Sequence, residues 1–352
     1  MAETAARSEI RETTILDVAR VAGVSKSTVS RVLNESPNVA NETRQHVLEI
    51  VSQLDFRANA AARGLRTTKS SLVGLLLPAI DNDVFSRVAE VIEADLRLEG
   101  VGLVIVSSGW EPAGERLALE SLRARRLDAL VLSLVNDRDP GLAELLAAIT
   151  RPIVLIDREI AGITRDAALT DLRSGVREAV EHLAGLGHRS IGIATISLDV
   201  LPGREVKSEF EATVARLELE APSKIVVPYD RIDRRSGWEI AERTLAAGAS
   251  AILCCVPNVV TAGVLEYLDK QEISIPEDVS IIAFDESELA SVKNPKLTVI
   301  YRPIDDLARF ASRMVISRLA DPAGPPCLES VRTTLRVRNS TAPPAVLSGR
   351  PA

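Results

Sequence analysis

Short, uninterrupted apolar runs alternate with amphipathic segments over most of this chain, and the alternation restricts the fold more than any other feature. From Ser71 onward we expect strands at residues 72–77, 101–106, 129–132, 152–156, 190–194, 225–227, 251–253 and 279–284. Helical patterns such as residues 173–186 separate them. Apolar strands separated by helices are typical of parallel sheets covered on both faces. The length of 352 residues leaves room for two such sheets of about 130 residues each, so we predict a two-lobed α/β core.

The first 69 residues differ in charge from the rest. They hold ten Lys and Arg against eight Asp and Glu, a net of +2, whereas the whole chain carries −7 and the other 283 residues therefore carry −9. The acidic total counts against nucleic acid as a partner, but only the local charge decides whether a surface can approach phosphate. This distribution indicates a small, mildly basic N-terminal unit attached to a large acidic body.

Three short helices are expected in the N-terminal unit. Residues 15–22 form an amphipathic pattern that Thr14 or Thr13 can cap, residues 25–33 resume it with a serine at the N-cap, and residues 41–54 follow. Counted from Ile15 as position 1, the small Ala19 falls at 5, Gly23 at 9 and the apolar Val29 at 15. A helix-turn-helix needs these residue types at these positions, since the glycine takes a positive φ in the turn.

The second helix carries short hydroxyls and two cations around its apolar positions. Hydroxyls and backbone amides at a helix start hold phosphates, and longer polar side chains reach base edges in the major groove. An ordinary three-helix bundle with a solvated polar face is the alternative. The polar residues of this helix are Ser25, Lys26, Ser27, Thr28, Ser30 and Arg31.

Residues 15–34 read ILDVARVAGVSKSTVSRVLN, and residues 56–67 read FRANAAARGLRT. Both segments resemble the headpiece of the lactose-repressor/galactose-repressor (LacI/GalR) family of bacterial transcription regulators. The resemblance implies that residues 58–69 form a hinge helix ordered only on operator DNA, with Leu65 as a wedge in the minor groove. It adds Asn34 and the groove-lining Asn59 and Ala62 to the DNA-binding set, with Lys26, Ser27 and Arg31 reading bases.

The hinge segment also makes physical sense by itself. Ten residues are too few for a stable isolated helix, and Gly64 costs about 1 kcal/mol more than alanine would. Contacts in a kinked minor groove can offset the cost of ordering it. Ala58 stands where the family usually has proline, which leaves the helix start less firmly defined.

The same family resemblance extends over the acidic body. Its motifs are IDRE at residues 156–159, EHLAGLGHR at 181–189, IPEDVSIIAFD at 275–285 and PKLT at 295–298. It implies a periplasmic-binding-protein-like core whose chain crosses between the lobes three times. We expect a disordered N-terminus at 1–11, a helix-turn-helix domain at 12–57, a core at 70–338 (one lobe at 70–168 and 300–328, the other at 169–299) and a flexible tail at 339–352.

The resemblance places an effector between the lobes, beyond the carboxyl ends of the strands. The candidate effector-binding residues are Phe85, Arg158, Asp171, Arg204, Asn258 and Asp285. Three polar groups of the family pattern are apolar here: Leu172, Val206 and Val259. Because a sugar site depends on several convergent hydrogen bonds, we expect a less polar or differently charged effector, or a weak response to any sugar.

Other function classes have less support. No nucleophile elbow, phosphate-binding loop or metal-spaced cluster occurs, so we expect neither an enzyme nor a metal or cofactor. His182 and His188 are interpreted as structural, and Cys254 and Cys255 as buried strand thiols. No apolar run approaches the ~18 residues of a membrane span, and the first ten residues lack the apolar core of a signal peptide, so we expect a cytoplasmic protein.

The sequence therefore predicts a DNA-binding transcription regulator, a repressor, that acts as a homodimer on a pseudo-palindromic operator. A small-molecule effector, carbohydrate-related in the family pattern, would control its operator affinity. The tail after Arg338 has no heptads, which argues against a tetramer-forming coiled coil. A solute-binding protein that serves a transporter is the alternative from another class, and an enzyme on a doubly wound fold is a third.

Overall fold

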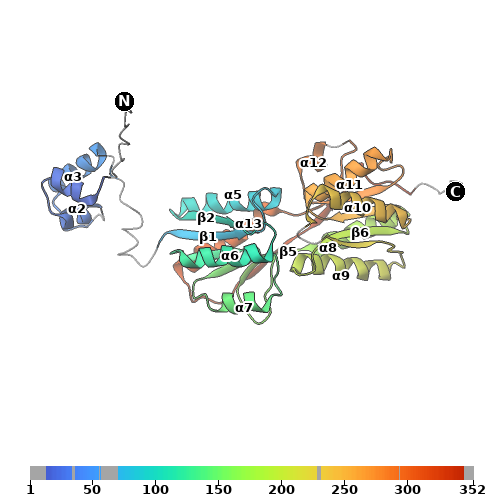
Figure 1. The fold of residues 1–352 in the computed structure, drawn as a ribbon, viewed down its shortest axis with the longest axis horizontal. Coiled ribbons are helices and arrows are strands. Elements are labelled where there is room, and N and C mark those ends of the chain that lie inside the picture. Colours follow the sequence, from blue (N-terminus) through green and yellow to red (C-terminus); the bar gives the residue numbers. More distant parts are fainter. Residues whose placement is uncertain are drawn as a thin grey trace, which may run out of the picture. The chain divides into compact units, whose positions relative to one another are not determined.

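The computed structural model describes residues 13–33, 36–54, 56, 70–227, 231–292 and 294–344. The chain divides into two compact units, residues 1–70 and 71–352 (Figure 1). The predicted hinge segment at 58–69 lies outside the described residues. Within the described part, no helix is long and apolar enough to cross a membrane.

Three helices form the N-terminal unit: α1 (Ile15–Val21), α2 (Lys26–Leu33) and α3 (Asn41–Gln53). Thr14 caps α1, because its hydroxyl accepts a hydrogen bond from the amide of Asp17 while the Asp17 carboxylate accepts one from the amide of Thr14 at 3.0 Å. The turn before α2 uses Gly23 at φ +65°, the conformation that the spacing predicted. Val18, Val29 and Val47 are completely buried where the three helices meet.

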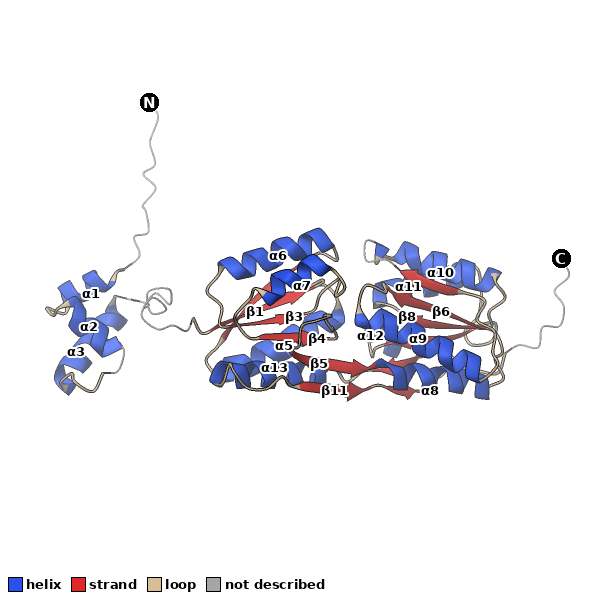
Figure 2. Cartoon of the chain, turned by 90° about the horizontal axis from the view of Figure 1, so that it is seen from below, coloured by secondary structure: helices blue, strands red, loops and turns tan. Residues whose placement is uncertain are grey.

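The first lobe of the second unit has a parallel six-stranded sheet in the order β11-β5-β4-β3-β1-β2. Helices α5 and α13 cover one face, and α6 and α7 cover the other (Figure 2). The elements are β1 (Leu72–Leu77), α5 (Asp83–Leu98), β2 (Gly102–Ser107), α6 (Pro112–Ala124), β3 (Ala129–Leu132), α7 (Pro140–Ala147), β4 (Ile153–Ile156), β5 (Asp166–Asp171), α13 (Ile304–Ala320) and β11 (Leu328–Arg332).

The second lobe repeats this architecture with the strand order β12-β10-β9-β8-β6-β7. All its strand pairs are parallel except β10 with β12. Helices α8 and α9 lie on one face and α10 and α11 on the other. The elements are α8 (Leu172–Gly185), β6 (Ile191–Ile196), α9 (Leu201–Arg216), β7 (Lys224–Val227), α10 (Arg234–Ala246), β8 (Ala251–Cys255), α11 (Asn258–Lys270), β9 (Ser280–Phe284), α12 (Glu288–Val292), β10 (Thr298–Tyr301) and β12 (Thr334–Arg336).

Each strand predicted from an apolar run is present, within two residues at either end. Cys254 and Cys255 are buried in β8, as expected. The strands β5, β10, β11 and β12 were not predicted. They are short or carry charged residues, such as the two aspartates that begin and end β5, so no continuous apolar run marks them.

The crossings between the lobes lie a few residues from their expected positions. Strand β5 remains in the first sheet through Asp171 and β10 remains in the second through Tyr301, whereas we expected the crossings at 168/169 and 299/300. Only Thr333 separates β11 in the first sheet from β12 in the second. Strand pairing holds each segment to the end of its ladder, and the chain crosses where the ladder stops.

The C-terminal segment packs against the second lobe further than the expected boundary at 338. Ser340 is fully buried, and its hydroxyl donates to the carbonyl of Ile281 at 2.6 Å. His188 is 1% exposed, and its ring is hydrogen-bonded to the hydroxyls of Ser250 and Ser280 and to the carbonyl of Ala342. The histidine thus joins two strand ends to the C-terminal segment, which is a structural role.

Candidate DNA-binding helix and ligand cavity

Helix α2 presents a polar surface of hydroxyls and cations. The side chains of Ser25, Lys26, Ser27 and Arg31 are exposed, and Thr28 is half-buried. The Ser25 hydroxyl accepts from the amide of Thr28 at 3.1 Å and lies 2.7 Å from the Ser27 hydroxyl, so it caps the helix. The first turn is therefore held in place while its cation and hydroxyls remain available to a partner.

Ser30 departs from this pattern, because it is only 7% exposed. At 100° per residue it lies beside the fully buried Val29, where the small serine is covered by the core of the unit. Ser30 was expected among the DNA-binding residues, but it is not part of the exposed polar surface of α2. Asn34, Asn59, Ala62 and Leu65 lie outside the described residues, so their roles stay predictions.

A cavity of about 90 Å³ lies between the two lobes of the second unit. Phe85 and Trp110 line it from the first lobe, with ring centroids 5.7 Å apart, and Leu172, Ile196 and Val206 line it from the second. Two thirds of its lining residues are apolar. Ligands of open parallel sheets bind at this end, beyond the carboxyl ends of the strands.

A cluster of three charged side chains forms one wall of the cavity. Arg302, in the crossing after β10, donates to both carboxylate oxygens of Asp285 at 2.9 and 2.7 Å and to Asp157 at 2.9 Å. The three side chains are 8 to 11% exposed. Burial lowers the pKa of Arg302, but the charges of Asp285 and Asp157 outweigh it and raise that pKa above its usual value. The guanidinium therefore stays charged and joins the end of β4 in the first lobe to the end of β9 in the second.

The loop after β3 is held from two sides. Arg158, 3% exposed, donates to the carbonyl of Leu134 and to its neighbouring carbonyl at Asp157. On the other side the carboxyl of Glu115, 2% exposed on α6, accepts from the amide of Val135. Burial raises the pKa of Glu115 to about 7, although the bond from Val135 and the charge of Arg158 act to lower it.

Two further contacts cross between the lobes. Arg204 on α9 forms an ion pair with Asp137 at 2.7 Å, and the Asp137 side chain is completely buried. The amide of Asn258 at the start of α11 donates to the carboxylate of Asp83 on α5 at 3.0 Å. The lobes are therefore connected by the chain's own side chains on both sides of the cavity.

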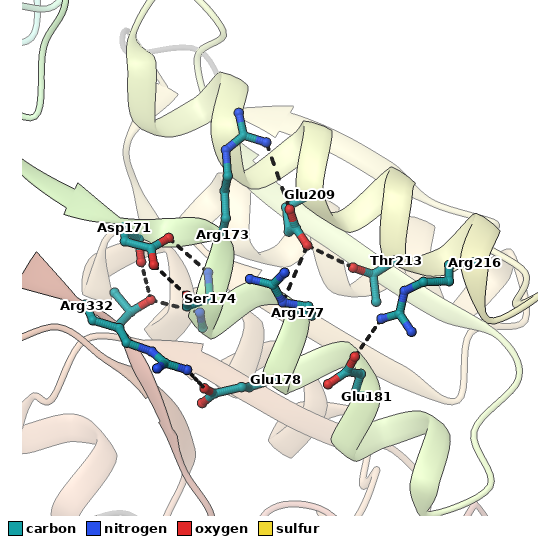
Figure 3. Close-up of polar contacts among 12 residues, drawn as sticks. Asp171, Arg173, Ser174, Arg177, Glu178, Glu181, Glu209, Thr213, Arg216 and Arg332 are labelled. Carbon is teal, nitrogen blue, oxygen red and sulfur yellow. Dashed lines mark hydrogen bonds and ion pairs between the residues drawn. The ribbon is translucent and has the colours of Figure 1, made fainter. Parts of the chain in front are cut away.

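Asp171 has a different role from the one we expected. Its carboxylate caps α8, accepting from the amide of Ser174 at 3.1 Å and from the Ser174 hydroxyl at 2.5 Å (Figure 3). Arg173 and Arg177 on the same helix reach Glu209 of α9, each at 3.9 Å. Asp171 is not among the residues that line the cavity.

The structure brings together four of the six candidate effector residues, since Phe85, Arg158, Asn258 and Asp285 all line the cavity. The side chain of Arg204 is paired with Asp137, and the carboxylate of Asp171 caps α8. Of the three apolar replacements, Leu172 and Val206 line the cavity, whereas Val259 is 41% exposed and does not.

Sequence reasoning missed Arg302, Asp157 and Ser133 as lining residues. The sequence carried a signal for Asp157, because this residue stands in the IDRE motif directly after a predicted strand. Ser133 likewise follows a predicted strand, β3. Arg302 follows β10, a strand that no apolar run marked, so its place at a strand end was not visible.

Two family models match the chain. Residues 14–59 match the model described as "Bacterial regulatory proteins, lacI family", and residues 180–341 match a periplasmic binding protein-like domain. These two matches cover the helix-turn-helix and most of the second lobe.

Curated relatives match over nearly the whole chain. The ribose operon repressor of Haemophilus influenzae is 30% identical over 314 residues, which is 88% of this chain and 92% of that protein. The HTH-type transcriptional regulator MalR of Streptomyces coelicolor is 29% identical over 346 residues, 96% of this chain and 99% of that one. Among solved structures, the lac repressor dimer bound to operator and an anti-inducer aligns with a TM-score of 0.81 at 22% identity, covering 94% of this chain and all of that chain. That likeness concerns the fold.

Proposed function

Since the chain belongs to the lacI family of bacterial regulatory proteins and is a DNA-binding transcription regulator, we propose how it acts. It represses its target genes as a homodimer on a pseudo-palindromic operator, with one α2 helix in the major groove of each half-site. A small molecule in the cavity between the lobes sets the operator affinity. The observation that carries the proposal is the exposed row of Ser25, Lys26, Ser27 and Arg31 on a capped helix after the Gly23 turn.

Control by the effector follows from the connections between the lobes. A ligand that fits one degree of lobe closure better than another shifts the population toward it, and the shift alters the spacing of the two hinge segments in a dimer. In this proposal residues 12–57 read DNA, residues 58–69 act as the hinge, and the core from residue 70 onward carries the cavity and the dimer contacts.

Operator DNA as the partner implies that the protein works in the cytoplasm. The relatives are transcription regulators, and the proposal assigns no reaction and no cofactor to the cavity. The solute-binding alternative has no use for the helix-turn-helix, which the family model for bacterial regulatory proteins also matches.

Fluorescence anisotropy tests the proposal directly. The full chain is titrated onto labelled DNA from upstream of its own gene and onto a scrambled duplex of equal length, over a range of salt concentrations. We expect at least a thousandfold preference for one site, and a log affinity that falls linearly with log salt. Equal affinity for both duplexes, or no dependence on salt, would overturn the proposal.

Replacing Arg31 with alanine should weaken operator binding by about tenfold or more, the range of one bidentate contact to a base. Binding to the scrambled duplex should change little. Arg97→Ala, which removes an exposed arginine from α5 in the core, is the matched control and should affect neither duplex. An equal loss on both duplexes would instead mark Arg31 as a phosphate contact.

Replacing Leu65 with alanine tests the hinge prediction. A wedge that unstacks a base step supplies contacts worth a few kcal/mol, so we expect operator affinity to fall at least tenfold in anisotropy titrations. Trp110 and Trp238 both lie in the core, so the denaturation curve by tryptophan fluorescence should not change. Leu98→Ala, at a position 84% exposed on α5, is the control. Unchanged operator binding would show that Leu65 is not the wedge.

A further inference from the structure

We infer that the ligand of the cavity is a small, neutral molecule with an apolar body and one hydrogen-bonding group. This group forms a hydrogen bond with the hydroxyl of Ser133. The inference rests on the proposed function in one respect, namely that the cavity between the lobes is the effector site.

The charges of the lining are balanced within the protein. Asp157 and Asp285 share the guanidinium of Arg302, with three hydrogen bonds of 2.7 to 2.9 Å. The other buried cation, Arg158, donates to two backbone carbonyls and lies near the carboxyl of Glu115. A charged ligand would therefore enter a site with no counter-charge left over, and burying an unpaired charge is costly.

Each amide side chain of the lining has one end in use within the protein. The Asn82 oxygen caps α5, accepting from the amides of Val84 and Phe85 at 3.0 and 3.3 Å. The Asn258 nitrogen donates to Asp83 of the opposite lobe at 3.0 Å. A ligand that bound the Asn82 oxygen or the Asn258 nitrogen would have to compete with a helix cap or with a contact between the lobes.

Ser133 is different. It follows β3, lines the cavity and is 1% exposed, and among the described residues its hydroxyl oxygen has no hydrogen-bond partner. Buried polar atoms are rarely left unpaired, so each one calls for an explanation. A ligand that hydrogen-bonds this hydroxyl supplies the missing partner.

The remaining surface is apolar and small. Phe85, Trp110, Ile156, Leu172, Ile196 and Val206 face a volume of about 90 Å³. A free sugar would bring several hydroxyls against a lining that is two-thirds apolar, and each unmatched hydroxyl would lose its bond to water. A ring or short alkyl body with a single hydroxyl matches both the surface and the free group.

Calorimetric titration of the full chain with four probes tests the inference. Benzyl alcohol has a neutral ring and one hydroxyl, toluene lacks the hydroxyl, benzoate carries a charge, and D-ribose is a neutral polyol. We expect benzyl alcohol to bind at least tenfold more tightly than D-ribose or benzoate, and several-fold more tightly than toluene. Tighter binding of D-ribose or benzoate than of benzyl alcohol overturns the inference, as does the absence of binding by all four.

A matched pair of variants locates the contact. Ser133→Ala removes this hydroxyl without breaking a hydrogen bond among the described residues. We expect it to weaken the binding of benzyl alcohol five- to tenfold and to leave the binding of toluene unchanged. Thr261→Val removes another buried hydroxyl without a partner among the described residues, on α11 and outside the lining, and should change neither affinity. Equal affinity of benzyl alcohol for wild type and Ser133→Ala would contradict the assignment to Ser133.

The same preparations separate this inference from the proposed function. If anisotropy shows a preferred operator while D-ribose outcompetes benzyl alcohol, only the ligand class is wrong. If benzyl alcohol binds through Ser133 but no DNA site is preferred, the cavity assignment stands and the regulatory proposal fails.

Discussion

Replacing Arg302 with glutamine is expected to lower the free energy of unfolding of the core by about 3–5 kcal/mol, the cost of removing one partner from a buried ion pair. Without the guanidinium, Asp157 and Asp285 remain buried side by side in one wall of the cavity, with no cation between them. Urea denaturation followed by tryptophan fluorescence measures the loss, since both tryptophans of the chain, Trp110 and Trp238, lie in the core.

Two controls separate the charge cluster from general surface effects. The triple variant Asp157→Asn, Arg302→Gln, Asp285→Asn removes all three charges together, and we expect it to recover most of the lost stability because no buried charge stays unpaired. Arg309→Gln breaks exposed ion pairs with Asp305 and Asp306 on the outer side of α13 and should cost no more than about 1 kcal/mol. A loss for Arg302→Gln as small as for Arg309→Gln would mean that the cluster is solvated.

The cluster illustrates what the sequence could and could not predict. Apolar runs predicted the strands β1 to β4 and β6 to β9, because the strands of a parallel sheet covered by helices on both faces are rich in apolar residues. Strand β5 begins with Asp166, whose carboxylate is paired with Arg318 of α13 at 2.5 Å. No local pattern reveals that a charge will be neutralised by a residue 152 positions away, so this strand was not predicted.

The candidate effector residues also divide into those whose place was predicted correctly and those whose place was not. Phe85, Arg158, Asn258 and Asp285 were expected at the effector site from the family resemblance, and all four line the cavity. Asp171 was expected there too, but it is the residue before α8, and a carboxylate at that position serves as an N-cap.

Arg204 shows that the sequence does not reveal the long-range partner of a polar side chain. It was a candidate effector residue, but its side chain is paired with Asp137, which lies in the other lobe. Which polar groups are paired and which are free depends on such long-range contacts, and this is what determines the ligand class. From Leu172, Val206 and Val259 the sequence predicted a less polar or differently charged effector, or a weak response to any sugar. The pairing of the remaining polar groups in the structure favours the less polar effector.

The stability of the core should depend on pH through Glu115, whose carboxyl holds the loop that carries Ser133 and Asp137. Burial raises the pKa of this carboxyl from 4.5 to about 7 in the folded protein. A folded-state pKa above the unfolded value means that the stabilising contribution is complete below pH 4.5 and is lost as the pH rises through 7. At about 1.4 kcal/mol per pKa unit, we expect the contribution of Glu115 to the free energy of unfolding to fall by about 3 kcal/mol between pH 4.5 and 8.

Glu115→Gln isolates this contribution, because glutamine cannot ionise but keeps an oxygen that accepts from the amide of Val135. The variant should match the wild type near pH 4.5 and be more stable by about 3 kcal/mol at pH 8 in urea denaturation. Comparing the two proteins at each pH cancels the titration of every other group. Glu120→Gln, at an exposed position on the same helix, should follow the wild-type curve. If Glu115→Gln also followed that curve, the Glu115 carboxyl would have to be solvated, and the Val135 amide would need another acceptor to hold the loop.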